Sequence, residues 1–146
     1  MTADRTRSLM IALLLAVVAA PPVASQDPVL RVIAMPREEK DASAGTHQGR
    51  MVDESLLEDW RRLRDQAVAQ GATIIVLEVT TPGGLVTTAE LMTEDLRDLR
   101  QQGIRTVGFV PHHATSAGAI ITLACKEVFM APRATLGNVI PLKFRD

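Results

Sequence analysis

Two short segments of the sequence contain residue types that can carry out acyl-transfer chemistry. A Pro-Gly-Gly triplet with Gly83 and Gly84 ends one apolar stretch, and Ser116, Ala117 and Gly118 follow another. Paired glycines allow positive φ angles and bring backbone N–H groups close to a ligand. A serine at a helix start offers a hydroxyl where the helix dipole can stabilise an oxyanion, and small neighbours leave room for a substrate carbonyl. Should the segments face each other, Ser116 is a candidate nucleophile, and Gly83, Gly84 and Ala117 are candidate oxyanion donors.

Each segment also has a simpler interpretation. The two glycines alone are typical of an ordinary turn between a strand and a helix. Ser116 alone is typical of a residue that caps the exposed N–H groups of a first helical turn. From the residue types by themselves, both alternatives remain open.

Strands and helices alternate around these segments. Apolar runs rich in β-branched residues predict strands, and apolar residues at three- and four-residue spacing predict helices. The expected strands are 29–35, 73–79, 104–110 and 127–131, and the expected helices are 55–70, 87–101 and 116–124. The interior of the second helix is expected to hold Leu91, Met92, Leu96 and Leu99. This order predicts an α/β fold of parallel βαβ units, with both chemical segments at carboxyl ends of strands.

The remaining segments are expected to be irregular. Residues 37–50 are charged and small and predict a loop or insert, and 132–141 predict a turn-rich return.

The ordered set of motifs resembles a known family. Buried strand, Thr-Pro-Gly-Gly-Leu, helix, buried strand, Ser-Ala-Gly, apolar helix, Met-Ala-Pro and Leu-Gly-Asn follow one another as in NfeD-type membrane-bound serine proteases. These proteases are grouped with Clp protease and SppA on the crotonase superfamily fold. The resemblance implies a Clp/crotonase-like serine endopeptidase domain with a Ser–Lys dyad, cleaving apolar peptide segments at or near the membrane. It implies Ser116 as nucleophile, Gly83, Gly84 and Ala117 as oxyanion donors, and a stomatin-like membrane protein as partner.

The general base is the main departure from the family pattern. The family lysine follows the serine by roughly forty residues, and an unassisted serine hydroxyl is a poor nucleophile. The substitutes considered are His112, His113, Lys126 and Lys143, each more simply explained as a solvated side chain. No histidine follows Ser116, which excludes the Clp-type order of serine, histidine and aspartate.

Two smaller departures accompany the missing base. Thr80-Thr81 stands where the family often has Asp-Thr, and the insert at 37–50 is longer than usual.

These features predict a carboxy-terminally truncated domain. The expected division is a signal peptide at 1–25, a first strand and polar insert at 26–50, and an incomplete peptidase domain at 51–146. Two alternatives remain: a catalytically inactive fragment that binds peptides or a partner, and a crotonase-type enzyme acting on acyl-CoA thioesters. Uncovered strand edges and apolar faces predict a homo-oligomer.

Composition and charge exclude several functions. The 146 residues contain 16 Lys and Arg against 17 Asp and Glu, which gives a net charge of -1 and no field to attract nucleic acid. The one basic cluster, Arg61, Arg62 and Arg64, predicts a solvated helix face. The sequence has neither a Cys/His cluster of the zinc type nor a P-loop, so no metal or cofactor is expected.

The amino terminus indicates export. Arg5 and Arg7 precede an apolar run over 9–20 and a small-residue site ending at Ser25, as in a secretory signal peptide. An uncleaved membrane anchor is the alternative, although 12 apolar residues fall short of a typical span. The single cysteine, Cys125, lies in an apolar stretch and is expected to be a buried small hydrophobic residue.

Overall fold

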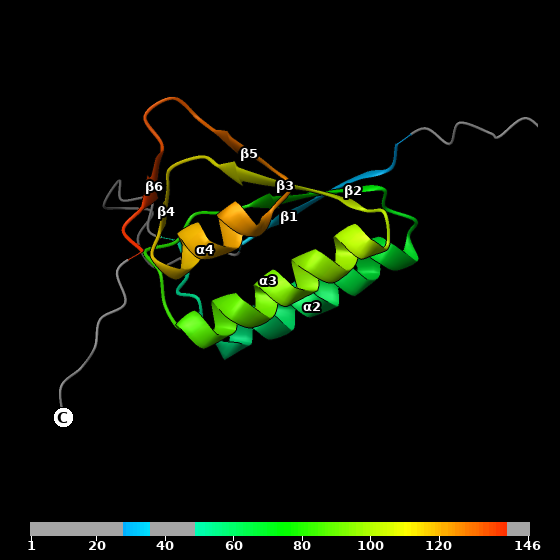
Figure 1. Ribbon diagram of the computed structural model, residues 1–146, viewed down its shortest axis with the longest axis horizontal. Helices are drawn as coiled ribbons and strands as arrows, with labels where there is room; N and C mark the ends of the chain where they lie inside the picture. Colours follow the sequence, from blue (N-terminus) through cyan, green and yellow to red (C-terminus); the bar gives the residue numbers. More distant parts are fainter. Residues whose placement is uncertain (1–27, 36–48, 140–146) are drawn as a thin grey trace, which may run out of the picture.

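The computed structural model describes residues 28–35 and 49–139, which form a main parallel sheet, a layer of helices that covers one of its faces, and a small second sheet (Figure 1). The elements are β1 (Leu30–Ala34), α2 (Glu54–Ala69), β2 (Ile74–Glu78), α3 (Val86–Gln101), β3 (Arg105–Val110), β4 (His113–Thr115), α4 (Ala117–Ala124), β5 (Glu127–Met130) and β6 (Thr135–Gly137). Every predicted strand and helix is present, with ends within one residue of those expected.

The main sheet has the order β1-β2-β3-β5, and every neighbouring pair is parallel. One helix connects each pair of successive strands, so three βαβ units follow one another along the chain. The predicted α/β class with parallel βαβ units is confirmed. Because parallel strands end at the same edge, the loops after β2 and β3 emerge side by side.

A second, two-stranded sheet was not predicted from the sequence. β4 pairs with β6 in parallel, with Thr115 opposite Gly137. Each strand is only three residues long, too short for a periodic pattern, and β6 lies in the segment expected to be a turn-rich return.

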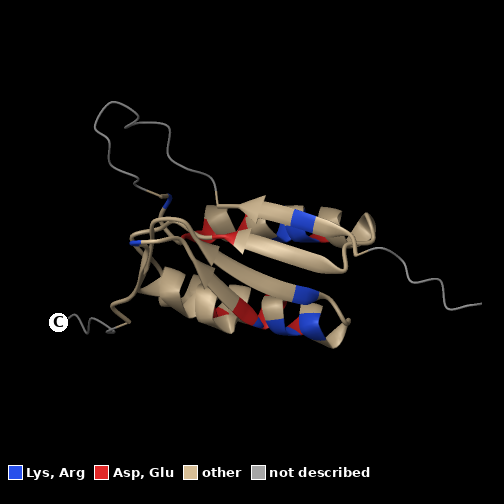
Figure 2. Cartoon of the chain, turned by 90° about the horizontal axis from the view of Figure 1, so that it is seen from above, with Lys and Arg blue, Asp and Glu red and all other residues tan. Residues whose placement is uncertain are grey.

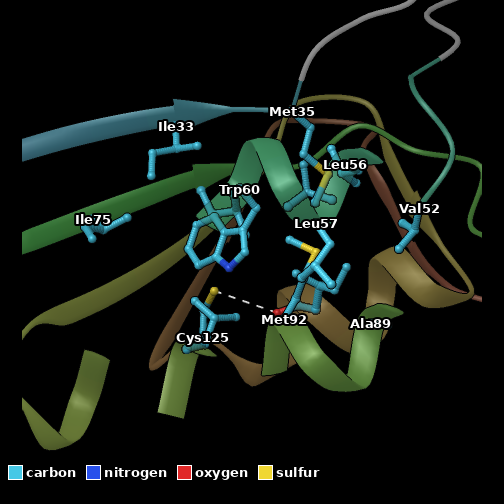
Figure 3. Close-up of a cluster of buried hydrophobic side chains, with 14 of the residues drawn as sticks. Ile33, Met35, Val52, Leu56, Leu57, Trp60, Ile75, Ala89, Met92 and Cys125 are labelled. Carbon is cyan, nitrogen blue, oxygen red and sulfur yellow. Dashed lines mark hydrogen bonds between the residues drawn. The ribbon is translucent and has the colours of Figure 1, made fainter. Parts of the chain in front are cut away.

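The helices pack on one face of the main sheet, where they enclose the core. Trp60 of α2 and Met92 of α3 lie in one buried cluster with Ile33 and Ile75 of the strands (Figure 3). Met92, Leu96 and Leu99 are buried as predicted. Leu91 is 39% exposed, so its predicted inward position was wrong. Thr88, Ala89 and Asp95 occupy the interior face of α3 in addition.

A buried carboxylate joins α2 to α3. Asp95 of α3 accepts hydrogen bonds from Trp60 Nε1 at 3.1 Å and Arg61 Nε at 3.0 Å. Arg64 Nη1 lies 2.8 Å from the other carboxylate oxygen. The prediction of a solvated basic face was therefore wrong for Arg64, whose side chain is 19% exposed, whereas Arg61 and Arg62 remain 43% and 63% exposed. Most charged residues of the described chain lie on these two helices (Figure 2).

Among the described residues, no helix covers the opposite face of the sheet (Figure 1). Val32, Val76 and Val107 are register partners across it. Val32 is 59% exposed at one edge and Phe129 is 57% exposed at the other. Such a face is unusual, because parallel sheets are normally covered on both sides.

Some predictions lie outside the described residues. These are the signal peptide at 1–25, most of the polar insert and Lys143. Within the ranges that are described, no helix is both long and apolar enough to cross a membrane.

Candidate active site

The glycine bend after β2 and the serine after β4 lie in direct contact. A Cβ atom placed on Gly83 would come within 2.9 Å of Ser116 Cβ and 3.5 Å of Ser116 Oγ. Gly83 has a φ of 120° and Gly84 a φ of 154°, a region that side chains disfavour. The absence of side chains therefore permits both the shape of the bend and its approach to Ser116.

Ser116 has a strained backbone and a free hydroxyl. Its φ of 52° and ψ of -117° belong to a region populated mainly by glycine. Although it precedes the first residue of α4, its side chain makes no capping hydrogen bond. The capping interpretation of Ser116 was therefore wrong. Oγ makes no hydrogen bond to any described residue, and the side chain is only partly buried.

Hydrogen bonds on both sides hold this conformation. Ser116 N–H donates to the carbonyl of Gly137 in β6 at 2.9 Å, which continues the pairing of β4 with β6. The carbonyl of Ser116 accepts from Ala119 N–H at 3.0 Å and Ile120 N–H at 3.2 Å in the first turn of α4. Strain at one residue persists when its neighbours are fixed in this way.

The three expected oxyanion donors differ in their present hydrogen bonds. Gly83 N–H already donates to Thr81 Oγ1 at 3.1 Å. Gly84 N–H has no acceptor among the described residues, and neither does Ala117 N–H. Two of the three N–H groups are thus available to a ligand without breaking a bond.

Gly118 does not provide the space that was expected. A Cβ atom placed there would lie 2.2 Å from Thr81 Cγ2, so the threonine methyl group already fills this position. Gly118 instead allows α4 to pack directly against the end of β2. The expectation that Gly118 leaves room for a substrate carbonyl was wrong.

The bend is also fixed from the side of α2. Val52 N–H donates to the Gly83 carbonyl at 2.8 Å, and Val52 accepts from Leu85 N–H at 2.7 Å. A Cβ atom on Gly84 would lie 2.2 Å from the Val52 carbonyl oxygen. Sequence reasoning missed both Val52 and Thr81. The signal for Thr81 was its position two residues before Gly83, because a threonine hydroxyl can accept a hydrogen bond from a backbone N–H two residues further on.

The candidate bases differ in how close they lie to Ser116 along the chain. Lys126 follows the carboxyl end of α4, and its backbone N–H is bonded to Thr106, so the whole helix separates it from Ser116. His112 and His113 lie just before Ser116, and both use their carbonyls in the framework, to Thr135 N–H and Thr81 N–H respectively. In the described part of the chain, no group of three or more His, Cys, Asp or Glu residues could hold a metal ion.

Cys125 is a structural thiol. It is 6% exposed, donates weakly to the Ile121 carbonyl at 3.8 Å, and lies in the core cluster (Figure 3). Burial raises the pKa of the Cys125 thiol to about 12. The predicted burial is confirmed, and the thiol stays protonated at neutral pH.

The fold thus places a strained serine beside a paired-glycine bend in an α/β domain of parallel strands. The family model of the NfeD1b N-terminal domain matches residues 49–143. The chain therefore belongs to the NfeD1b N-terminal domain family, and the sequence-based recognition is confirmed.

Two relatives are similar to part of this chain in sequence. The chain is 38% identical over 78 residues to membrane protein NfeD1b of Bacillus subtilis, covering 53% of this chain and 17% of that protein. It is 40% identical over 67 residues to the uncharacterized protein MJ0137 of Methanocaldococcus jannaschii, covering 46% of this chain and 22% of that protein. It thus spans about a fifth of the length of these relatives.

A solved structure shares the fold. The 1510-N membrane-bound stomatin-specific protease, in a serine-to-alanine mutant form, matches with a TM-score of 0.59 and 20% identity, covering 75% of this chain and 46% of that one. The predicted α/β fold of parallel βαβ units is confirmed, and it resembles the fold of this protease domain.

Proposed function

We propose that this domain is the nucleophile-bearing part of a serine endopeptidase of the Ser–Lys type. The observation that carries the proposal is the position of Ser116, strained and unbonded at Oγ, against a bend that leaves Gly84 N–H free. Backbone strain of this kind concentrates at functional sites.

The proposed reaction begins with attack of Ser116 Oγ on the carbonyl carbon of a peptide bond. A carbon–oxygen bond forms while the hydroxyl proton passes to the base. The carbonyl oxygen becomes an oxyanion, which accepts hydrogen bonds from Gly84 N–H and Ala117 N–H. The base then protonates the departing amine as the carbon–nitrogen bond breaks, and water hydrolyses the resulting ester. Each oxyanion donor typically lowers the barrier by about 3–4 kcal/mol.

Gly83 takes a different role in this proposal. The N–H of Gly83 donates to Thr81 Oγ1, so Gly83 shapes the bend. The oxyanion then accepts its hydrogen bond from Gly84 N–H. By resemblance to the family we assign the base to its lysine, roughly forty residues after the serine, and not to Lys126, which the length of α4 separates from Ser116.

The names of two relatives support a proposal for the substrate and the setting. The solved relative is a membrane-bound protease specific for stomatin, and another relative is a membrane protein. We propose that this domain acts on apolar peptide segments outside the cytoplasm, at or near the membrane, with a stomatin-like protein as partner. No metal or cofactor takes part in the proposed chemistry.

One observation favours a second function. Oγ of Ser116 makes no hydrogen bond to a basic side chain among the described residues. A domain without a base would bind peptides at the same site and release them intact.

Labelling with a serine-directed phosphonate tests the proposal. In the full chain, we expect a covalent adduct located at Ser116 by peptide mass spectrometry and absent in Ser116→Ala. Ser55→Ala removes a serine at the start of α2 and serves as the matched control, with labelling unchanged. An adduct that persists in Ser116→Ala contradicts the nucleophile assignment. Peptide binding without any adduct supports the binding function.

A further inference from the structure

Thr81 is the residue through which the glycine bend and the serine segment are joined. It lies between β2 and the bend and is fully buried, with no exposed surface. Its contacts reach both sides of the candidate site. The resemblance to known proteases gave it no role.

The hydroxyl of Thr81 fixes the bend. Oγ1 accepts from Gly83 N–H at 3.1 Å and lies 3.3 Å from the Gly83 carbonyl oxygen, to which it can donate. One hydroxyl thereby binds both polar backbone groups of Gly83 and closes a tight side-chain turn. Since the Gly83 peptide planes are held on both sides, the N–H of Gly84 has a defined direction.

The backbone of Thr81 fixes the serine segment. Thr81 N–H donates to the His113 carbonyl at 3.0 Å, and the Thr81 carbonyl accepts from Thr115 N–H at 3.1 Å. These bonds form an isolated parallel bridge to Ala114, in the strand that leads into Ser116. The same residue therefore sets the position of the nucleophile relative to β2.

The methyl group of Thr81 fixes the helix. Cγ2 occupies the place where a side chain on Gly118 would lie, at 2.2 Å from its built Cβ atom. The amino-terminal turn of α4, which contains Ala117, is seated on this methyl group. Threonine is the residue that supplies both the hydroxyl and the methyl branch.

We propose that Thr81 is the positioning residue of the oxyanion site, with its hydroxyl aligning Gly84 N–H and its methyl group aligning Ala117 N–H toward one point beside Ser116. The inference rests on the proposed serine chemistry. A displacement of about 1 Å in such a site can cost about a hundredfold in rate.

Two conservative substitutions separate the hydroxyl from the methyl group. Thr81→Val keeps the branched shape and removes the hydroxyl, whereas Thr81→Ser keeps the hydroxyl and removes the methyl group. Thr80→Val is the matched control, because Thr80 is buried next in sequence and its Oγ1 has no hydrogen-bond partner among the described residues. Circular dichroism and thermal midpoints confirm that each variant folds.

The measurement is phosphonate labelling of Ser116 in the full chain, resolved into the affinity of the reversible complex and the maximal rate of adduct formation. We expect Thr81→Val to lower the maximal rate about tenfold to a hundredfold, with the affinity unchanged. Thr81→Ser should retain a larger share of the rate, and Thr80→Val should match the wild type. If Thr81 served only to stabilise the fold, its substitution would lower the thermal midpoint. It would not lower the maximal rate of adduct formation while leaving the affinity of the reversible complex unchanged.

Several results overturn the inference. If Thr81→Val is labelled at the wild-type rate, the proposed role of the Thr81 hydroxyl is contradicted. Equal losses in Thr80→Val and Thr81→Val indicate a general response of the core. Failure of the wild-type protein to react at Ser116 overturns the proposed function itself and this inference with it. Amide exchange on the unmodified protein gives a test free of mutations: Gly83 N–H should be protected relative to Gly84 N–H, and equal exchange contradicts the arrangement.

Discussion

Ser116 combines a strained backbone with a side chain that stabilises nothing in the described structure. A residue other than glycine at a φ of 52° and ψ of -117° is costly, typically by about 1–3 kcal/mol. Oγ neither caps α4 nor bonds to another described residue. This unbonded hydroxyl on a strained backbone supports the proposed role of Ser116 as nucleophile.

Replacing Ser116 by glycine should stabilise the protein. Ser116→Gly removes the Cβ atom that disfavours this conformation, and we expect the free energy of unfolding to rise by about 1 kcal/mol. Ser116→Ala is the control, because it removes the hydroxyl and keeps the Cβ atom, and it should stay within about 0.5 kcal/mol of the wild type. Urea unfolding measures both. A loss of stability in Ser116→Gly would show that the backbone there is unstrained.

At the scale of elements, helices α2 and α3 are joined by polar as well as apolar contacts. The side chain of Asp95 is 11% exposed and binds Trp60, Arg61 and Arg64. A carboxylate removed from water to this degree requires such partners, since an unpaired buried charge is strongly destabilising. The pair of helices in turn supports the strands that end at the candidate site.

Neutralising Asp95 should weaken this connection. Asp95→Asn keeps the shape and removes the charge that three donors share, and we expect a loss of about 2 kcal/mol in the free energy of unfolding. Asp65→Asn is the matched control, because Asp65 also pairs with Arg64 but is 68% exposed, and it should change stability by less than about 0.5 kcal/mol. Equal effects of the two substitutions would contradict a specific role for Asp95.

At the scale of the whole molecule, the helices that the structure describes cover one face of the sheet and leave the other open. The other face presents Val32 and Phe129 at opposite edges, both more than half exposed. Burying apolar surface of this kind is favourable by about 25 cal/mol per Å². We therefore keep the expectation that this domain forms homo-oligomers, and we place the contact on this face.

Charges introduced on the open face should prevent self-association. We expect Val32→Glu with Phe129→Glu to shift the sedimentation coefficient toward the monomer at concentrations where the wild type associates. Leu123→Glu is the control, because Leu123 is 61% exposed on α4, in the helical layer, and should leave association unchanged. A monomeric wild type at all concentrations would contradict the expectation.

The regular elements could be predicted because their signals are local. Strands such as β2 are continuous apolar runs, and α2 and α3 repeat apolar residues at helical spacing. The adjacency of Gly83 and Ser116 was also accessible, since both follow parallel strands that end at one edge. Leu91 was wrongly placed inside, because periodicity gives only the average direction of a helix face. The burial of Asp95 was missed, because periodicity does not indicate which polar residue has hydrogen-bond partners in the interior.

The sequence by itself determined the α/β class, the family and the residues able to do chemistry, because residue type and order carry that information. Only the tertiary structure decided which of these residues are free to act. In the structure, Gly83 N–H donates to Thr81 Oγ1, whereas Gly84 N–H has no acceptor among the described residues. The side chain of Ser116 does not cap α4. These outcomes depend on which backbone groups meet across β2, β4 and β6, and contacts between segments distant in the chain leave no local pattern.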